Sequence, residues 1–272
     1  MRIQTASCKR WFVIAFILGT TSVASAAQGQ SFTGKAPEKT AGSGYRASMA
    51  LTGDDIIVKM LERNRVRSER LQRYSSVRTY EIRNLQGKVA AQTVVRVDYE
   101  APDKKTFNKT SERGSTIVRH LVFDRLIQSE GETSSGPEHH DSAITEANYA
   151  FTLVGEEDLG PYHCFVLTAA PKRKDKYLFE GKIWIDAVDF AIVKIAGHPA
   201  KKPSFWINRA DFVREYQRID DFWLPFKDKT FVEVKMYGRK VLTVDHQNYI
   251  VNSENPVQVE TGDVGNPDQQ FR

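Results

Sequence analysis

Short apolar segments joined by tight turns fill the carboxy-terminal half of the chain, and this pattern restricts the folds available to it. Segments 182–186 and 190–196 are separated by a short connection, and segments 231–237 and 241–249 repeat this pattern across Gly238 and Arg239. Such spacing is typical of β-hairpins. Because the sequence has no long alternation of strands with helices, we expect antiparallel pairing and no parallel sheet.

Two amphipathic segments predict helices. In residues 54–73 apolar side chains recur at helical intervals among charged ones, and Thr52 and Asp54 are suited to cap the first turn. The same kind of spacing predicts a second helix over residues 115–130, ended by Gly131. Further strands are expected at residues 77–85, 90–99, 105–110, 150–154 and 163–169. The predicted fold class is mainly β, with one strongly curved antiparallel sheet and two helices against its concave side.

The amino-terminal residues have the pattern of an export signal. Three basic residues precede an apolar run over residues 11–18, and Ala24-Ser25-Ala26 follows as a cleavage site. We therefore predict cleavage and a periplasmic location, with an uncleaved anchor as the alternative. The predicted organisation is a signal peptide at 1–26, a flexible linker at 27–50, a folded domain at 51–252 and a disordered tail at 253–272.

Charge and cysteine content narrow the classes of partner. The whole chain carries a net charge of +5, and removal of the three basic residues of the signal peptide, which has no acidic residue, reduces it by three to +2. This small excess gives no reason to expect a nucleic-acid partner. Cys164 is the one cysteine that remains after cleavage, so no intramolecular disulfide is expected.

Candidate catalytic and metal-binding residues are few. His139, His140 and Asp141 carry ligand types that suit zinc or copper, but no partner lies at a diagnostic spacing, and a solvated loop is the favoured interpretation. His163 and Cys164 could form a nucleophile pair, yet neighbours on a strand point to opposite faces, which favours a buried Cys164. The sequence contains no Gly-x-Ser-x-Gly elbow, no His-Glu-x-x-His motif and no phosphate-binding glycine loop, so we expect no enzyme activity, no cofactor and no metal.

Large aromatic rings and short basic turns suggest a lipid ligand. A curved sheet covered by only two helices leaves an apolar concavity, and an acyl chain gains about 0.8 kcal/mol for each CH₂ removed from water. The basic turn of Lys172, Arg173 and Lys174 is a candidate for contact with phosphate head groups, although such turns commonly serve only to keep a loop solvated. The candidate lipid-binding rings are Trp184, Phe190, Phe205, Trp206, Phe212, Trp223 and Phe226.

Several segments also resemble the LolA-like outer-membrane lipoprotein-sorting proteins. The resemblance spans about residues 54–251 and involves mostly structural positions: 155–160, 171–174, 180–186, 190–195, Trp206, 223–225, 237–238, and the region from Arg63 to Tyr80. It implies an unclosed antiparallel half-barrel whose open side is covered by a helical lid and whose apolar cavity holds lipoprotein acyl chains. It also implies partners among the lipoprotein-transfer proteins of the inner and outer membranes.

Three functional hypotheses follow. The first is a periplasmic carrier of lipid or lipoprotein that holds acyl chains on the concave face, with segments 54–73 and 115–130 as a lid. The second is an envelope signalling or scaffold protein that binds a protein partner through the same sheet, as periplasmic regulators of similar fold bind an anti-sigma factor. The third, and least supported, is a hydrolase that uses Cys164 or the His139-His140 loop.

Overall fold

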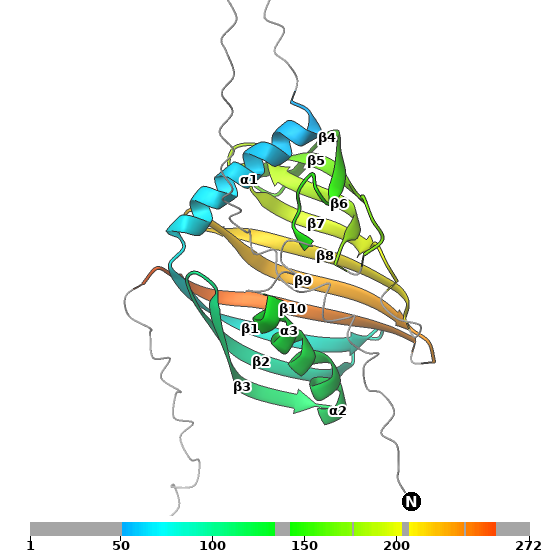
Figure 1. Cartoon of the computed structure of the whole chain (residues 1–272). Coiled ribbons are helices and arrows are strands. Elements are labelled where there is room, and N and C mark those ends of the chain that lie inside the picture. Colours follow the sequence, from blue (N-terminus) through cyan, green and yellow to red (C-terminus); the bar gives the residue numbers. More distant parts are fainter. Residues whose placement is uncertain (1–50, 134–141, 176, 203–206, 237, 254–272) are drawn as a thin grey trace, which may run out of the picture.

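The structure is a computed structural model that describes residues 51–133, 142–175, 177–202, 207–236 and 238–253 (Figure 1). The predicted signal peptide, linker and nearly all of the predicted tail lie outside these residues. So do Phe205, Trp206 and the segment from His139 to Asp141. Within the described ranges, no helix is both long and apolar enough to span a bilayer.

Ten strands form a single antiparallel sheet. In spatial order it runs β3-β2-β1-β10-β9-β8-β7-β6-β5-β4, so β3 and β4 are its free edges and the sheet does not close. The first and last strands, β1 and β10, lie side by side within this order. The strands are β1 (Arg73–Asn84), β2 (Val89–Glu100), β3 (Lys104–Gly114), β4 (Tyr149–Leu159), β5 (Tyr162–Pro171), β6 (Phe179–Asp186), β7 (Ile192–Pro199), β8 (Ile207–Ile219), β9 (Phe222–Val234) and β10 (Gly238–Val251).

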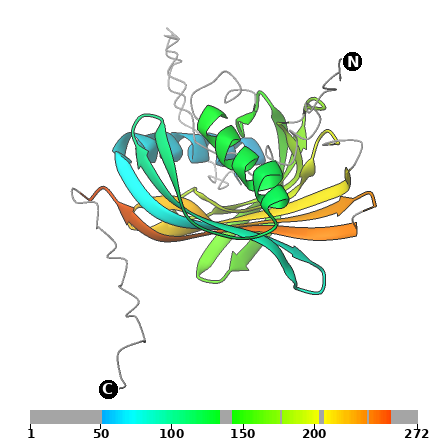
Figure 2. The same cartoon turned by 90° about the horizontal axis from the view of Figure 1, so that it is seen from below.

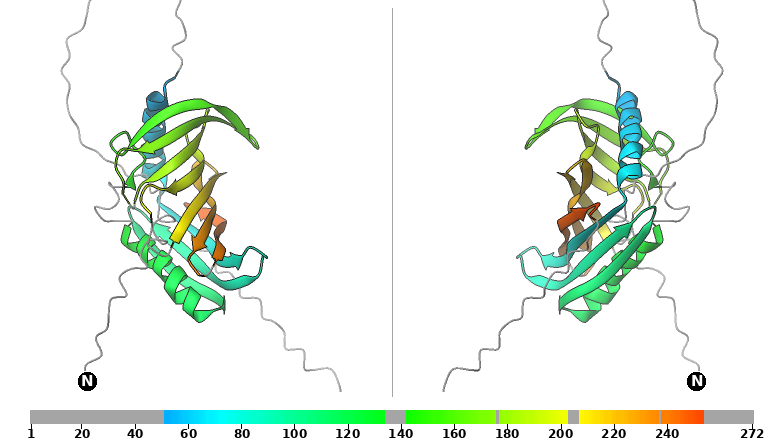
Figure 3. Two further views of the ribbon diagram at one scale, coloured as in Figure 1. Left: turned by 90° about the vertical axis from the view of Figure 1, so that its right-hand side faces the viewer. Right: turned by 90° about the vertical axis from the view of Figure 1, so that its left-hand side faces the viewer.

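The helices lie on one side of this sheet (Figure 2). They are α1 (Gly53–Arg70), the short α2 (Thr116–Val118), the π-helical segment η1 (Arg119–Phe123) and α3 (Asp124–Thr133). The sheet curves around them, so that α1 and α3 cover its concave face (Figure 3). The predicted fold class, an open half-barrel of mainly β structure with a helical cover, is therefore confirmed.

Local signals place the helix starts more accurately than the helix ends. Thr52 caps α1 in a capping box with Asp55, and the Ser115 hydroxyl accepts a hydrogen bond from the backbone N–H of Val118. The prediction that the first helix extends to residue 73 is wrong, because the backbone becomes extended at Leu71. The prediction that Gly131 ends the second helix is also wrong, since α3 continues to Thr133. A glycine costs a helix only about 1 kcal/mol relative to alanine, which packing can offset.

The hairpin segments are confirmed with shifted boundaries. The predicted strand 231–237 is the end of a longer strand, β9, that stops at Val234, and β10 already begins at Gly238. The predicted strand 190–196 is β7, displaced to Ile192–Pro199. Positive backbone φ angles at Phe190 and Met236 mark the two connections, and these angles end the regular pairing earlier than the apolar pattern suggests.

Two apolar clusters divide the concave face. The first joins α1 to β4–β8, and the second joins η1 and α3 to β1, β2 and β10. Each half of the half-barrel therefore has its own helix, and the two helices cover different strands. The buried members of the first cluster include Ile56, Ile57, Met60, Tyr149, Leu167, Ile183, Ile185, Ile195 and Phe212; those of the second include Tyr74, Tyr80, Val95, Val97, Phe123, Leu126, Leu242 and Val244.

Candidate binding site on the concave face

Between the two apolar clusters the concave floor is polar and buried. Arg78 on β1 pairs with His246 on β10, and Arg214 on β8 pairs with Asp228 on β9. Val244 of β10, a buried residue of the second apolar cluster on the concave face, pairs with Asp228 of β9. Strand alternation therefore places these four side chains on the concave face as well. All four are at least 90% buried. The half-barrel thus has charged groups at its centre, where an apolar cavity was expected.

One buried ion pair crosses the middle strands. The guanidinium Nε of Arg214 donates to Oδ1 of Asp228, and Nε2 of His246 lies 3.0 Å from Oδ2 of the same carboxylate. Burial opposes ionisation of Asp228, but Arg214 and the His246 hydrogen bond outweigh it and lower the pKa of Asp228. Burial lowers the pKa of His246, so the imidazole is neutral at pH 7 and donates Nε2–H to the carboxylate.

A second buried ion pair connects α3 to the floor. Oε2 of Glu130 lies 2.5 Å from Nη1 of Arg78, and Oε1 lies 3.1 Å from Nζ of Lys105 on β3. The carboxylate of Glu130 thus bridges β1 and β3, with one cation at each oxygen. Burial opposes ionisation of Glu130, but the two cations outweigh it and hold its pKa well below the usual range.

Several polar atoms of this floor have no hydrogen-bond partner among the described residues. They are Ser76 Oγ, Arg78 Nε, Thr93 Oγ1, Thr230 Oγ1 and His246 Nδ1, from strands β1, β2, β9 and β10. An unsatisfied buried donor or acceptor costs about 1–3 kcal/mol. Their concentration on one buried surface indicates a place that can accept the polar group of a ligand, or water.

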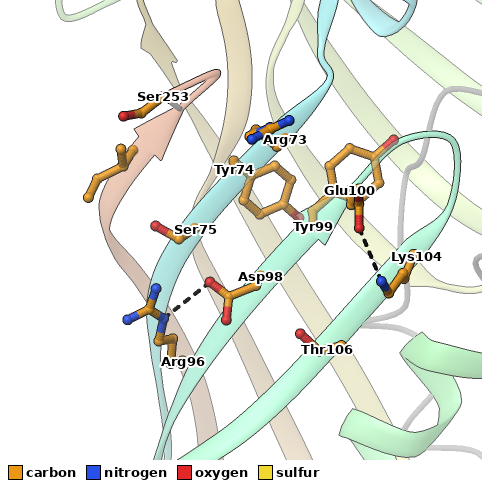
Figure 4. Close-up of a pocket in the computed structure, with 11 residues that line it drawn as sticks. Arg73, Tyr74, Ser75, Arg96, Asp98, Tyr99, Glu100, Lys104, Thr106 and Ser253 are labelled. Atoms are coloured by element: carbon orange, nitrogen blue, oxygen red, sulfur yellow. Dashed lines mark hydrogen bonds and ion pairs between the residues drawn. The ribbon is translucent and has the colours of Figure 1, made fainter. Parts of the chain in front are cut away.

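A pocket of about 380 Å³ opens at the ends of β1, β2, β3 and β10 (Figure 4). The rings of Tyr74 and Tyr99 stack in it at 5.1 Å. Four of its charged groups form two ion pairs, Arg96 with Asp98 at 3.1 Å and Lys104 with Glu100 at 3.1 Å. Tyr74 and Tyr99 belong to the cluster under α3, but Ser75, Asp98 and Thr106 pair with one another across β1, β2 and β3 and alternate with concave-face residues, so most of the lining lies toward the convex face. Its lining is Arg73, Tyr74, Ser75, Arg96, Asp98, Tyr99, Glu100, Lys104, Thr106, Ile250 and Ser253.

Two of the rings predicted to bind lipid pack into the apolar cluster that α1 covers, each against a different neighbour. Phe212 packs edge-on against Phe179 at 5.7 Å, and Phe190 stacks on Phe165 at 6.1 Å beneath Lys59 of α1. Both Phe190 and Phe212 belong to the first apolar cluster.

The other described rings lie elsewhere. Trp184 stands between Ile183 and Ile185 and so points to the opposite face, where its indole N–H donates to Glu157 at 2.8 Å. Trp223 packs on Tyr162 at 4.7 Å, and Phe226 is 46% exposed. The five predicted rings that the structure describes do not form one lining. These rings were predicted from their size, and ring size gives no information about the face of the sheet on which a side chain lies.

The basic turn predicted to contact head groups is exposed. Lys172, Arg173 and Lys174 follow β5, and Arg173 donates from Nη1 to the Asn148 side chain at 2.6 Å. None of these three side chains contributes to the buried floor. The floor cations were not predicted from the sequence, although Arg78 lies in phase with Tyr74, Ser76 and Tyr80 at the alternate buried positions of β1. A charged residue at a position where the alternation predicts a buried side chain was therefore the sequence signal for a buried charge.

The described residues show no assembled catalytic group. Cys164 is buried, and burial raises the pKa of its thiol to about 11. The imidazole of His163 is engaged by Asp158 at 2.6 Å and by Glu156 at 2.9 Å. No cluster of metal-ligating side chains occurs within the described ranges.

Comparison with known proteins gives structural neighbours only. No family model matches the chain, and no curated protein matches it either. A solved outer-membrane lipoprotein-sorting protein domain from Vibrio parahaemolyticus, described as putative, is 12% identical, covering 75% of this chain and 94% of its own, with a TM-score of 0.40. A LolA superfamily protein from Nitrosomonas europaea is 10% identical, covering 76% and 96%, with a TM-score of 0.34.

A third neighbour, a DUF1329 family protein from Desulfovibrio piger, is 16% identical, covering 75% of this chain and 93% of its own, with a TM-score of 0.39. The first two neighbours carry the names of the family that the sequence resembles. Likeness at this level concerns the fold, so the function has to be argued from the site.

Proposed function

We propose that this protein is a periplasmic carrier that binds the acyl chains of a lipid or lipoprotein on the concave face, beneath α1 and α3. The observation that carries the proposal is the division of that face into two apolar halves, each covered by one helix, with a buried polar floor between them. This is the distribution that an amphiphile requires: apolar surface for chains beside polar groups for the head.

Binding in this proposal requires the helices to move. In the described residues Ile57 and Met60 of α1 and Phe123 and Leu126 of η1 and α3 fill the apolar surfaces that acyl chains would contact. An acyl chain of about 16 carbons gains on the order of 12 kcal/mol from leaving water, which is enough to compete with one helix face.

The end of α1 offers a test of this movement. Arg67 donates from Nη2 to the carbonyl oxygen of Asp189, in the turn between β6 and β7, whereas Arg65 pairs within the helix with Glu69. We expect Arg67→Met to speed uptake of a fluorescent fatty acid, because α1 loses its attachment to that turn. Arg65→Met is the matched control and should leave uptake unchanged.

The decisive experiment is native mass spectrometry of the mature protein purified from the periplasm, followed by solvent extraction of any ligand. A stoichiometric acylated adduct supports the carrier. A ligand-free mass, together with no binding of a fluorescent fatty acid by either arginine variant, contradicts it.

One observation favours the alternative, a scaffold that binds a protein partner. Phe231 lies on the convex face, 41% exposed, and the Nζ of Lys229 lies 4.8 Å from its ring centre. Aromatic side chains are enriched at protein interfaces. In-cell crosslinking through position 231 that yields one stable protein partner, with no co-purified lipid, would support this alternative over the carrier.

A further inference from the structure

The carboxylate of Glu130 sits where a bound anion would sit. Its two oxygens contact Arg78 at 2.5 Å and Lys105 at 3.1 Å, and the three side chains are 11%, 4% and 8% exposed respectively. Arg78 and Lys105 thus converge on one buried carboxylate. Proteins use the same two residue types to bind carboxylate and phosphate ligands. The α3 helix therefore places its own anion in a site built from two strands.

The surrounding charges favour a second anion over a cation. Among the described residues, the buried floor carries three cations, Arg78, Lys105 and Arg214, and two anions, Glu130 and Asp228. This leaves an excess of one positive charge. Beside it, the N–H of Arg78 Nε and the hydroxyl of Ser76 have no partner among the described residues, so further donors point into the same space.

The α3 helix is attached by contacts that can be exchanged. Its apolar contacts centre on Leu126 and on Phe123, whose ring lies 5.9 Å from that of Tyr80. At the margin Asp124 pairs with Lys109 at 2.6 Å. The helix continues directly from the π-helical segment η1, and such segments are often found at functional sites.

We propose that Arg78 and Lys105 form the head-group site for an anionic amphiphile, and that Glu130 is an internal competitor that leaves with α3 when the ligand binds. Exchange of one carboxylate for another singly charged anion leaves the net charge of the floor unchanged. The inference rests on the proposed carrier function. The shared chemistry is an anionic oxygen head on an acyl chain, which a fatty acid carboxylate or a phospholipid phosphate supplies.

Four ligands with twelve-carbon chains test the proposal by titration calorimetry on the mature chain: dodecanoate, dodecyl phosphate, dodecanol and dodecyltrimethylammonium. We expect at least one anion to bind about tenfold or more tighter than dodecanol, and the ammonium compound to bind weakest. The tighter of the two anions identifies the source as a fatty acid or a phospholipid. Equal affinities for the anions and dodecanol would overturn the inference.

Glu130→Gln removes the internal competitor and keeps a side chain of the same shape. If the closed state holds at least about 90% of the molecules, the anions should bind about tenfold tighter or more, with little change for dodecanol. Asp124→Asn is the matched control, since it weakens the attachment of α3 at the margin without touching the buried cations. An equal gain for all four ligands in both variants would show that Glu130 only holds the helix down.

Lys105→Met provides a second variant that does not leave a buried cation unpaired. It removes one cation, keeps the ion pair of Arg78 with Glu130, and retains most of the length of the side chain. We expect the preference for anions over dodecanol to disappear. A preference that persists in this variant would overturn the head-group site, whereas a wild-type protein that binds none of the four ligands would overturn the carrier function itself.

Discussion

Protonation of His246 provides a quantitative test of the buried polar floor. The imidazole is 4% exposed, and its Nε2 lies 3.0 Å from Oδ2 of Asp228. Burial lowers its pKa from the ordinary value of 6.5. In the unfolded chain the same ring regains that ordinary value. Between the two pKa values the unfolded chain therefore binds one more proton than the folded protein.

The sign and the size of the effect follow from this difference. The free energy of unfolding is fully maintained above pH 6.5 and decreases as the pH falls toward the folded-state pKa. The slope cannot exceed about 1.4 kcal/mol per pH unit for one proton. Integrated from about pH 6.5 to about pH 5.5, the loss is at most about 1 kcal/mol. Glu130 and Asp228, whose pKa values are lowered from 4.5 and 3.8, add a further loss only at more acidic pH.

Urea unfolding followed by tryptophan fluorescence at about pH 7.5, 6.5 and 5.5 measures this loss in the wild type and in His246→Gln. Glutamine retains an N–H donor for Asp228 but does not titrate, so the part of the pH dependence that comes from this ring should disappear. His163→Gln is the control, because Asp158 and Glu156 raise the pKa of His163, which makes its contribution decrease as the pH rises. Equal slopes for the wild type and His246→Gln would refute the assignment of a buried neutral imidazole.

Three further variants test the packing, with unfolding free energies as the readout. Ile57→Ala, at a fully buried site of α1, should cost about 2–5 kcal/mol, whereas Val58→Ala, 54% exposed, should stay within about 0.5 kcal/mol; similar values would mean that α1 is not docked as described. Asp228→Asn should cost about 3–5 kcal/mol by leaving buried Arg214 without its charge partner, and a neutral effect would contradict that burial. Gly181→Ala should destabilise the β6–β7 pair, because the new Cβ would lie 2.1 Å from a carbonyl oxygen of β7; an unchanged midpoint would argue against this close pairing.

Local patterns in the sequence determined most of the secondary structure. Segment 182–186 became part of β6 because its apolar and β-branched residues favour a strand, and Thr52 marked the start of α1 by a hydrogen bond that needs only neighbouring residues. Ends of elements were less predictable. The stop of β9 at Val234 depends on a turn with a positive φ at Met236, which no apolar periodicity reveals.

Residue type alone could not predict on which face of the sheet each aromatic ring lies. Phe212 and Trp184 are both large rings on strands, yet one packs under α1 and the other on the opposite face. Irregularities in the pairing, such as the shift between Trp184 and Ile185, change the phase of the alternation along a strand. The sequence shows how many large rings the chain has, but the face of the sheet that each ring occupies depends on the pairing of the strands.

Sequence alone determined that the chain builds an antiparallel sheet with two helices, because hairpin spacing and helical periodicity are local properties. The tertiary structure alone decided that the centre of the concave face is charged. Arg78 and Glu130 are 52 positions apart, and Lys105 and Glu130 are 25 positions apart. They meet because β3, β2 and β1 lie side by side and α3 folds back over them. Burial then makes their pairing obligatory, since an unpaired charge removed from water costs far more than a surface one.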